Sequence, residues 1–263
     1  MDKSVVWRRE NHVAIMTLNR PAQYNVINNQ MSRDFRQALL ECWDDDDVRA
    51  IVLTGTGNAF SGGGDIKFMV AALKAGHISP GFESMLPIWH GVIEFLREIP
   101  KPVIAALNGV VAGGGLGLAL ACDFRIASPD INFFTSFLGI GASPDSSCSF
   151  FLPRFVGMGR ATELFMRNTP VTAEEALELG FVNAVVPKES VMDESMALAT
   201  ELAQGPTSAF GRTKQLLNQS MSSSLKDHLL SEARLVTVSA VSPDFSEGVN
   251  AFVEKRKPNF TGK

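Results

Sequence analysis

Two glycine-rich turns constrain the fold of this chain more than any other feature of its sequence. The first turn (residues 59–67, AFSGGGDIK) follows an apolar run at 50–54, and the second (residues 108–117, NGVVAGGGLG) follows an apolar run at 103–107. Each apolar run is typical of a buried strand, and each turn leads into a segment with the pattern of a helix. Glycines at such a place expose backbone N–H groups, and the start of a helix favours negative charge.

Either turn alone could be no more than a tight turn or a flexible linker. As a pair, the two turns could direct two backbone N–H groups at one oxygen atom, where each donor contributes roughly 3–4 kcal/mol to the stability of a transition state. The second turn could also be mistaken for a dinucleotide-binding loop. Its glycines lack the G-x-G-x-x-G spacing, and no acidic residue stands about 20 positions further on at a strand end, so we discard that interpretation.

Strand, turn and helix recur through the first two thirds of the chain, which predicts parallel strands joined by crossover helices. Further strands are expected at 13–18, 124–127 and 132–134, and helices at 30–43, 66–73, 86–96 and 116–122. Beyond residue 170 the apolar spacing predicts helices at 173–179, 191–203, 210–221, 225–239 and 245–255. We therefore expect an α/β fold with a core at residues 1–200 and a helical C-terminal region at residues 201–263.

The composition excludes several classes of protein. A chain of 263 residues, 45% of them apolar, can bury a substantial core, and a net charge of −4 without a basic stripe argues against a nucleic-acid partner. Cys42, Cys122 and Cys148 lie far apart without C-x-x-C spacing, so we expect reduced thiols in the cytoplasm and no metal site. No stretch approaches the roughly 20 apolar residues of a membrane span, and the charged first residues lack the apolar region of a secretory signal. We therefore expect no membrane partner.

Three motifs in fixed order resemble the crotonase (enoyl-CoA hydratase/isomerase) superfamily. They are F-S-x-G-x-D-I at 60–66, P-K-P-V-I-A-A-x-N-G at 100–109 and G-G-G-x-x-L-A-L-x-C-D at 113–123. The similarity extends from residue 18 to residue 260 and so covers essentially the whole chain. It implies a crotonase-like spiral of ββα turns with a helical C-terminal region that builds homotrimers, often paired into hexamers.

The resemblance also implies an acyl-CoA substrate whose thioester carbonyl lies between the N–H groups of Gly64 and Gly114. Coenzyme A is then part of the substrate, and no separate cofactor is expected. By the same resemblance, Lys67 lies near the CoA phosphates. Other CoA contacts are implied for the backbone around Ala22, Asn25 and Ile66, which would surround the adenine, and for Phe252 and Lys255, which would reach the CoA of a neighbouring subunit.

The reaction depends on acid and base groups that vary within this superfamily. Hydratases that resemble this chain use two glutamates, at the positions of Gly117 and Phe137, where neither residue can titrate. One carboxylate remains, Asp145, and enoyl-CoA isomerases similar to the phenylacetate-pathway isomerase carry an aspartate at this position. A single carboxylate is enough for a 1,3-proton shift. Asp145 also precedes a predicted helix at 146–151, so it could instead be a helix N-cap worth about 1 kcal/mol.

His90 could be a surface residue of its helix or a second catalytic group. In 4-chlorobenzoyl-CoA dehalogenases, which resemble this chain, a histidine at this position accompanies the aspartate just described; the aspartate attacks the ring and the histidine activates water. Phe82 and Trp89 also fit their aromatic pocket, but Phe137 stands where those enzymes have tryptophan and Gly64 where they have phenylalanine.

We therefore predict an enoyl-CoA isomerase. Three alternatives stay open: a dehalogenase-type hydrolase, another thioester hydrolase or decarboxylase of the same fold, and a catalytically silent acyl-CoA-binding protein.

Overall fold

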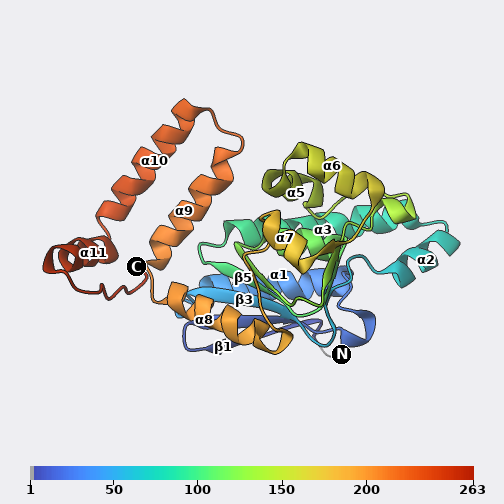
Figure 1. Cartoon of the computed structure of the whole chain (residues 1–263), viewed down its shortest axis with the longest axis horizontal. Helices are drawn as coiled ribbons and strands as arrows, with labels where there is room; N and C mark the ends of the chain where they lie inside the picture. The colour runs from blue at the N-terminus through green and yellow to red at the C-terminus, as the bar shows by residue number, and fades with distance from the viewer. Residues whose placement is uncertain (1–2) are drawn as a thin grey trace.

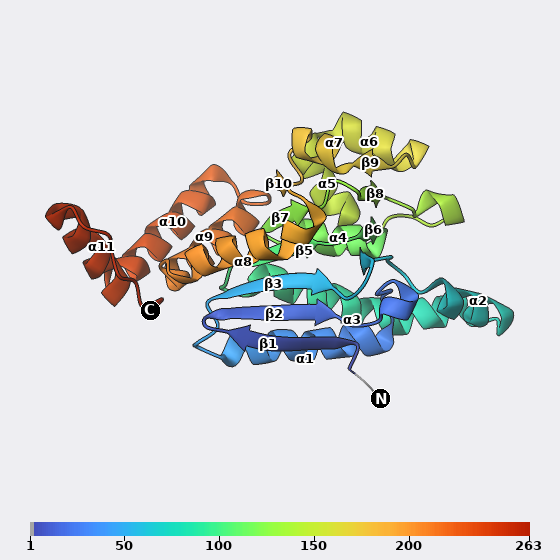
Figure 2. The same ribbon diagram turned by 60° about the horizontal axis from the view of Figure 1, so that its bottom comes forward.

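The computed structural model describes residues 3–263, and its core is a six-stranded sheet with the order β1-β2-β3-β5-β7-β10. Strand β1 pairs antiparallel with β2, and the other neighbours are parallel. Figure 2 shows β1, β2 and β3 side by side. The strands are β1 (Val5–Glu10), β2 (Val13–Leu18), β3 (Ala50–Gly55), β5 (Val103–Leu107), β7 (Phe124–Ala127) and β10 (Ala184–Val185).

Helices cover both faces of this sheet, which explains why its central strands are mostly apolar and why β5 is apolar at every position. On one face, Ile51 and Leu53 of β3 belong to a cluster with residues of α1 (Asn29–Asp44) and α3 (Ile78–Glu98). On the other face, Ala50 and Val52 pack in a cluster with residues of α8 (Val191–Ala203).

A second, four-stranded sheet positions the two glycine turns. Its order is β4-β6-β8-β9, where β4, β6 and β8 are parallel and β9 is antiparallel to β8. The strands are β4 (Ala59–Ser61), β6 (Val110–Ala112), β8 (Asn132–Phe134) and β9 (Val171–Thr172). The glycine run at 62–64 follows β4, and the glycine run at 113–115 follows β6. Because β4 and β6 are parallel neighbours, both glycine runs leave the same edge of the sheet.

The helical C-terminal region extends away from the sheets, at the opposite end from α2 (Ile66–Lys74) (Figure 1). It consists of α9 (Thr207–Ser220), α10 (Leu225–Ala240) and α11 (Pro243–Glu254). The buried Lys214 of α9 ties it to the core, since its ammonium group donates to the backbone oxygen of Leu96 and forms an ion pair with Asp123 at 2.8 Å. The predicted division at residue 200 stays a prediction, and that residue lies within α8.

The remaining helices are α4 (Gly114–Ala121), α5 (Cys148–Val156), α6 (Met158–Arg167) and α7 (Ala173–Glu178). Within residues 3–263, no helix is long and apolar enough to cross a membrane. The three cysteines are free, in agreement with the prediction of unpaired thiols, and all three are buried.

The predicted strands at 13–18, 103–107, 124–127 and 132–134 are confirmed with the predicted bounds. Two predictions were wrong in detail. The glycine-rich turns were expected without strands, but each contains one, β4 or β6. The helix expected at 86–96 begins at Ile78, because Pro80 lies in its first turn, where a helix does not use the backbone N–H.

Candidate active site

The backbones of the two glycine turns pack against each other. A Cβ added to Gly63 would lie 2.6 Å from the carbonyl oxygen of Ala112 and 3.1 Å from the nitrogen of Gly114, and Gly63 has a φ of +84°. Only glycine allows this approach and this backbone angle. The contact places Gly64, the next residue, beside Gly114, as the sequence prediction of a shared oxygen site requires.

Both candidate N–H donors are available to a ligand. Gly114 is the first residue of α4, so its N–H has no partner within the helix. Gly64 lies between two hydrogen bonds to Ile27, from the Ile27 N–H to the Gly63 oxygen and from the Asp65 N–H to the Ile27 oxygen, so its own N–H points away from Ile27. Within residues 3–263, neither N–H donates a hydrogen bond to another residue.

Four side chains surround these glycines. A Cβ on Gly64 would lie 2.7 Å from Cε of Met69. A Cβ on Gly114 would lie 3.0 Å from Cδ1 of Ile27 and 2.8 Å from the hydroxyl of Ser146. The fourth is the buried Phe137, whose ring would contact a Cβ on Gly113 at 3.9 Å.

The loop at 145–147 closes the space where a hydratase-type glutamate was considered. A Cβ on Gly117 would lie 1.9 Å from the carbonyl oxygen of Ser146, a distance that no side chain can tolerate. Gly117 is therefore required by the packing of this loop on α4. A carboxylate at this position would need a different path for the loop.

Asp145 is the first residue of this loop. It is half-buried, and its Oδ1 accepts a hydrogen bond from the hydroxyl of Ser146 at 2.8 Å. The interpretation of Asp145 as a helix N-cap was wrong, because α5 begins at Cys148, its N-cap is Ser147, and no side chain caps it. Two consecutive left-handed serines separate Asp145 from that helix.

The two aromatic candidates on α3 differ in burial, and His90 differs from both. Trp89 is buried; its indole N–H donates to the hydroxyl of Ser146 at 2.8 Å, and its ring lies tilted against that of Phe35 at 6.2 Å. Phe82 is half-buried, whereas His90 is exposed. The side chain of His90 has no hydrogen bond or ion pair with any residue of the described part of the chain.

The residues assigned to CoA lie in two places. Residues 22–27 run along the first glycine turn, since the Gly62 N–H donates to the Tyr24 oxygen at 2.8 Å. There Ala22, Ile66 and Lys67 are exposed, whereas Asn25 is buried and its side chain bonds the Arg20 N–H and the oxygens of Thr56 and Ala59. These contacts bring the residues expected around the adenine to one side of the first turn.

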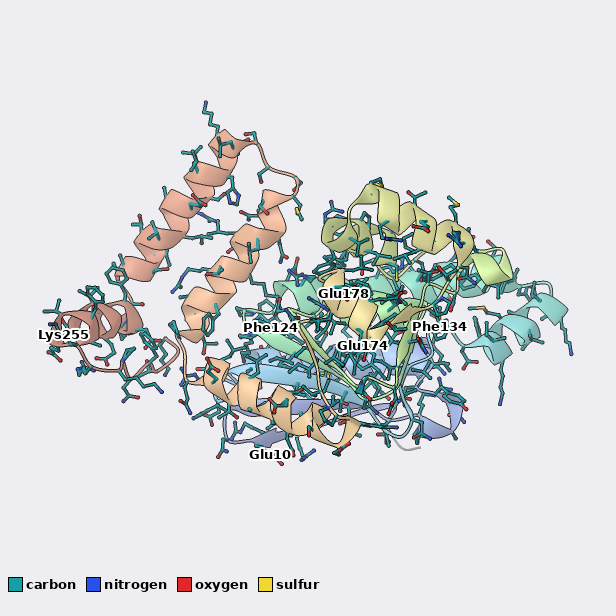
Figure 3. The ribbon with its side chains drawn as sticks, in the orientation of Figure 1. Glu10, Phe124, Phe134, Glu174, Glu178 and Lys255 are labelled. Carbon is teal, nitrogen blue, oxygen red and sulfur yellow. The ribbon has the colours of Figure 1, made fainter. Side chains whose placement is uncertain are left out.

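Phe252 on α11 and Lys255, the residue that follows this helix, are exposed and lie far from the glycine turns of the same chain. In Figure 3, Lys255 lies at the far left end of the molecule, whereas Phe134, whose oxygen accepts a hydrogen bond from the Gly113 N–H, lies in the right half of the core. The predicted contact of Phe252 and Lys255 with CoA could therefore be made only in a neighbouring subunit.

A cavity of about 620 Å³ with a mixed apolar and charged lining begins just beyond the loop. Two lining residues locate the cavity relative to the loop. Ile93 lies one helical turn beyond Trp89 on α3, and Ser147 is the last residue of the loop. The apolar lining of the cavity includes Ile93, Leu120, Phe151, Phe155 and Met221, and its polar lining includes Glu94, Arg97, Glu98, Ser147, Arg154 and Asn218. Sequence reasoning missed this cavity and also missed Ile27, Met69 and Ser146, because none of these residues belongs to a motif.

Comparisons with known proteins agree with this architecture. The family model described as enoyl-CoA hydratase/isomerase matches residues 8–263. The chain is 35% identical to the 1,2-epoxyphenylacetyl-CoA isomerase of Escherichia coli strain K12, over 97% of each chain. It is 36% identical to a 4-chlorobenzoyl coenzyme A dehalogenase of an Arthrobacter species, over 92% of this chain and 88% of that one. A crystal structure of an enoyl-CoA hydratase from Polaromonas sp. JS666 matches with a TM-score of 0.93 and 30% identity, over 97% of this chain and 99% of that one.

Proposed function

We propose that this chain, which belongs to the enoyl-CoA hydratase/isomerase family, is an enoyl-CoA isomerase that moves a double bond in its acyl-CoA substrate. One observation carries the proposal: the site has a carboxylate at Asp145 and no room for another at Gly117. The relatives named above carry out different reactions, so the family alone does not select one.

The proposed reaction needs two functions, an oxyanion site and one proton carrier. The N–H groups of Gly64 and Gly114 would hold the thioester oxygen, and each donor would stabilise the negative charge of the dienolate by roughly 3–4 kcal/mol. Asp145 would take a proton from C2 or C4 and return one to the other carbon. Because the same carboxylate is regenerated, this cycle requires neither a second acid nor an activated water.

The substrate would extend from the residues assigned to CoA, past the two glycine turns, to the cavity beyond the loop. The CoA part would lie along residues 22–27, with Lys67 near its phosphates, and the acyl group would point past the loop toward the cavity lined by Ile93 and Phe151. Phe252 and Lys255 of a neighbouring subunit would complete the CoA site in a homotrimer or a hexamer. Apolar side chains left exposed on α10 and α11 support such an assembly; they include Leu225, Leu229, Leu230, Phe252 and Val253.

The test is the ultraviolet absorbance of the conjugated product when 3-enoyl-CoA is incubated with the protein. We expect a rise with wild type and at least a 100-fold lower rate with Asp145→Asn, because amide nitrogen cannot accept the proton. Asp130→Asn is the matched control, since Asp130 is exposed in a distant turn. Equal rates for wild type and Asp145→Asn would refute the proposal. Binding of acyl-CoA without turnover of any thioester would instead support the silent-binding alternative.

A dehalogenase-type reaction is the second candidate, because His90 adjoins Trp89, which binds the loop that carries Asp145. In that reaction, Asp145 would attack the halogenated ring carbon and His90 would activate the water that hydrolyses the ester. Gly64 and Phe137 provide a smaller aromatic enclosure than the resemblance implies for dehalogenases. Chloride release from 4-chlorobenzoyl-CoA that is lost in His90→Gln would favour this candidate, and no release would remove it.

A further inference from the structure

A chain of two hydrogen bonds connects the buried helix α3 to the candidate catalytic carboxylate. The indole N–H of Trp89 donates to the hydroxyl oxygen of Ser146 at 2.8 Å, and that hydroxyl lies 2.8 Å from Oδ1 of Asp145. Trp89 is 1% exposed and Ser146 is 3% exposed, so water competes little for either bond. The motifs and the glycine turns assign no role to Ser146.

The direction of these bonds follows from the groups that form them. An indole N–H can only donate, so the Ser146 oxygen must accept from Trp89. The hydroxyl hydrogen of Ser146 must then point elsewhere, and Oδ1 of Asp145 is the acceptor within reach. Trp89 therefore sets the orientation of the Ser146 hydroxyl, and this hydroxyl marks Oδ1 as the oxygen that is already hydrogen-bonded.

The backbone conformation at Ser146 is strained. Ser146 and Ser147 have φ values of 51° and 65°, in the left-handed region that residues other than glycine rarely adopt. Ser146 also packs on α4 through two of its groups. Its carbonyl oxygen lies against Gly117, and its hydroxyl lies against Gly114, where an added Cβ would meet each group. Backbone angles of this kind persist only where the surrounding structure fixes them, and they gather at functional sites.

We propose that Ser146 is a positioning residue that holds the carboxylate of Asp145 so that Oδ2 faces the substrate. The proposal rests on the isomerase function proposed above. In the first step the C–H bond at C2 or C4 breaks, the proton passes to Oδ2, and the electron pair enters the dienolate, whose oxygen is held by Gly64 and Gly114. Without the hydroxyl, rotation about the Cβ–Cγ bond of Asp145 is only weakly restricted, because this torsion has broad minima.

The first test compares Ser146→Ala with Ser147→Ala. Both residues are left-handed, so the two variants share the backbone change, but the Ser147 hydroxyl bonds backbone oxygens and not Asp145. We expect kcat to fall about 10- to 100-fold in Ser146→Ala, with KM within about threefold of wild type, because a misplaced catalytic group costs rate more than binding. Ser146→Gly, which suits the left-handed backbone but lacks the hydroxyl, should show the same loss, because the loss comes from the hydroxyl and not from the backbone. An equal fall in Ser147→Ala would overturn the proposal.

The second test needs no substrate. In ¹⁵N-labelled protein, the indole N–H resonance that disappears in Trp89→Phe is that of Trp89. We expect this resonance to shift in Ser146→Ala and also in Asp145→Ala, although Asp145 does not bond the indole, and to stay unchanged in Ser147→Ala. A resonance that is insensitive to Asp145→Ala would refute the directed chain of bonds.

The two tests separate this proposal from the proposed function. Resonance shifts in a protein that turns over no 3-enoyl-CoA would contradict the isomerase assignment and leave the positioning of Asp145 supported. Isomerase activity that is equal in wild type and Ser146→Ala would leave the function supported and overturn the role of Ser146. Non-additive effects of Trp89→Phe and Ser146→Ala on kcat would support the order Trp89, Ser146, Asp145, and additive effects would contradict it.

Discussion

Gly117→Ala is the substitution whose effect the structure defines most closely. The new Cβ would lie 1.9 Å from the carbonyl oxygen of Ser146, whereas an ordinary contact is about 3.4 Å, so the loop would have to move by about 1.5 Å. Overpacking of this kind costs about 1–3 kcal/mol of folding free energy. The same movement displaces Asp145, and a misplacement of about 1 Å at a catalytic group can lower the rate about 100-fold.

We therefore expect Gly117→Ala to lower kcat about 100-fold while the protein remains folded, and to lower Tm by several degrees, at roughly 2–4 °C per kcal/mol for a chain of this size. The assay is turnover of 3-enoyl-CoA at a temperature well below the measured Tm, together with a thermal melt. Gly159→Ala is the control, because Gly159 lies in a helix with nothing within 4 Å of the new Cβ. A Gly117→Ala variant with wild-type kcat and Tm would refute the reasoning about the loop.

Further predictions concern the surroundings of the site. Asn25→Ala should destabilise the fold by about 1–3 kcal/mol in urea unfolding and raise KM more than it lowers kcat, because three backbone groups lose their partner and residues 22–27 shift; an unchanged KM would contradict this. Lys214→Met should lower the unfolding free energy by about 1–3 kcal/mol in the same assay, less than for an isolated buried pair, because Arg97 still binds Asp123 at 3.0 Å. Burial raises the pKa of the Cys122 thiol to about 12 from its ordinary value of 9.0, so at pH 8 its thiolate should be about 1,000-fold rarer than usual; Ellman's reagent should label it quickly only after denaturation, and fast labelling of the native protein would contradict this.

The sequence predicted β2, β3, β5 and β7 of the large sheet well because most of their residues are buried on both faces. Residues 103–107, for example, are apolar throughout, and no helix of that length could be bounded by Pro102 and Asn108. The short strands β4 and β6 escaped prediction because three residues carry too little periodicity. Strand β1 was also missed, since Val5 alone of its six residues is buried.

The candidate site could be predicted where glycines in the sequence indicate the backbone conformation. It could not be predicted where tertiary contacts set the orientation of a side chain. The pairing of Gly64 with Gly114 could be inferred from two turns of one kind. The orientation of Asp145 could not, because it depends on two left-handed serines and on a tryptophan 57 residues earlier than Ser146, and neither carries a local signal. The position of Trp89 behind the loop likewise becomes visible only when α3 is packed against α4.

The central claim is that one carboxylate both removes and returns the proton, and isotope transfer tests it most directly. Wild type would be incubated in ordinary water with 3-enoyl-CoA that carries deuterium at C2, and the earliest 2-enoyl product would be examined by mass spectrometry and NMR. The account predicts that a measurable share of the deuterium appears at C4, because Asp145 is half-buried and can deliver the label before exchange, and that Asp145→Asn forms no product. Product without any deuterium at C4 in the first turnovers, or product formed at the wild-type rate by Asp145→Asn, would contradict it.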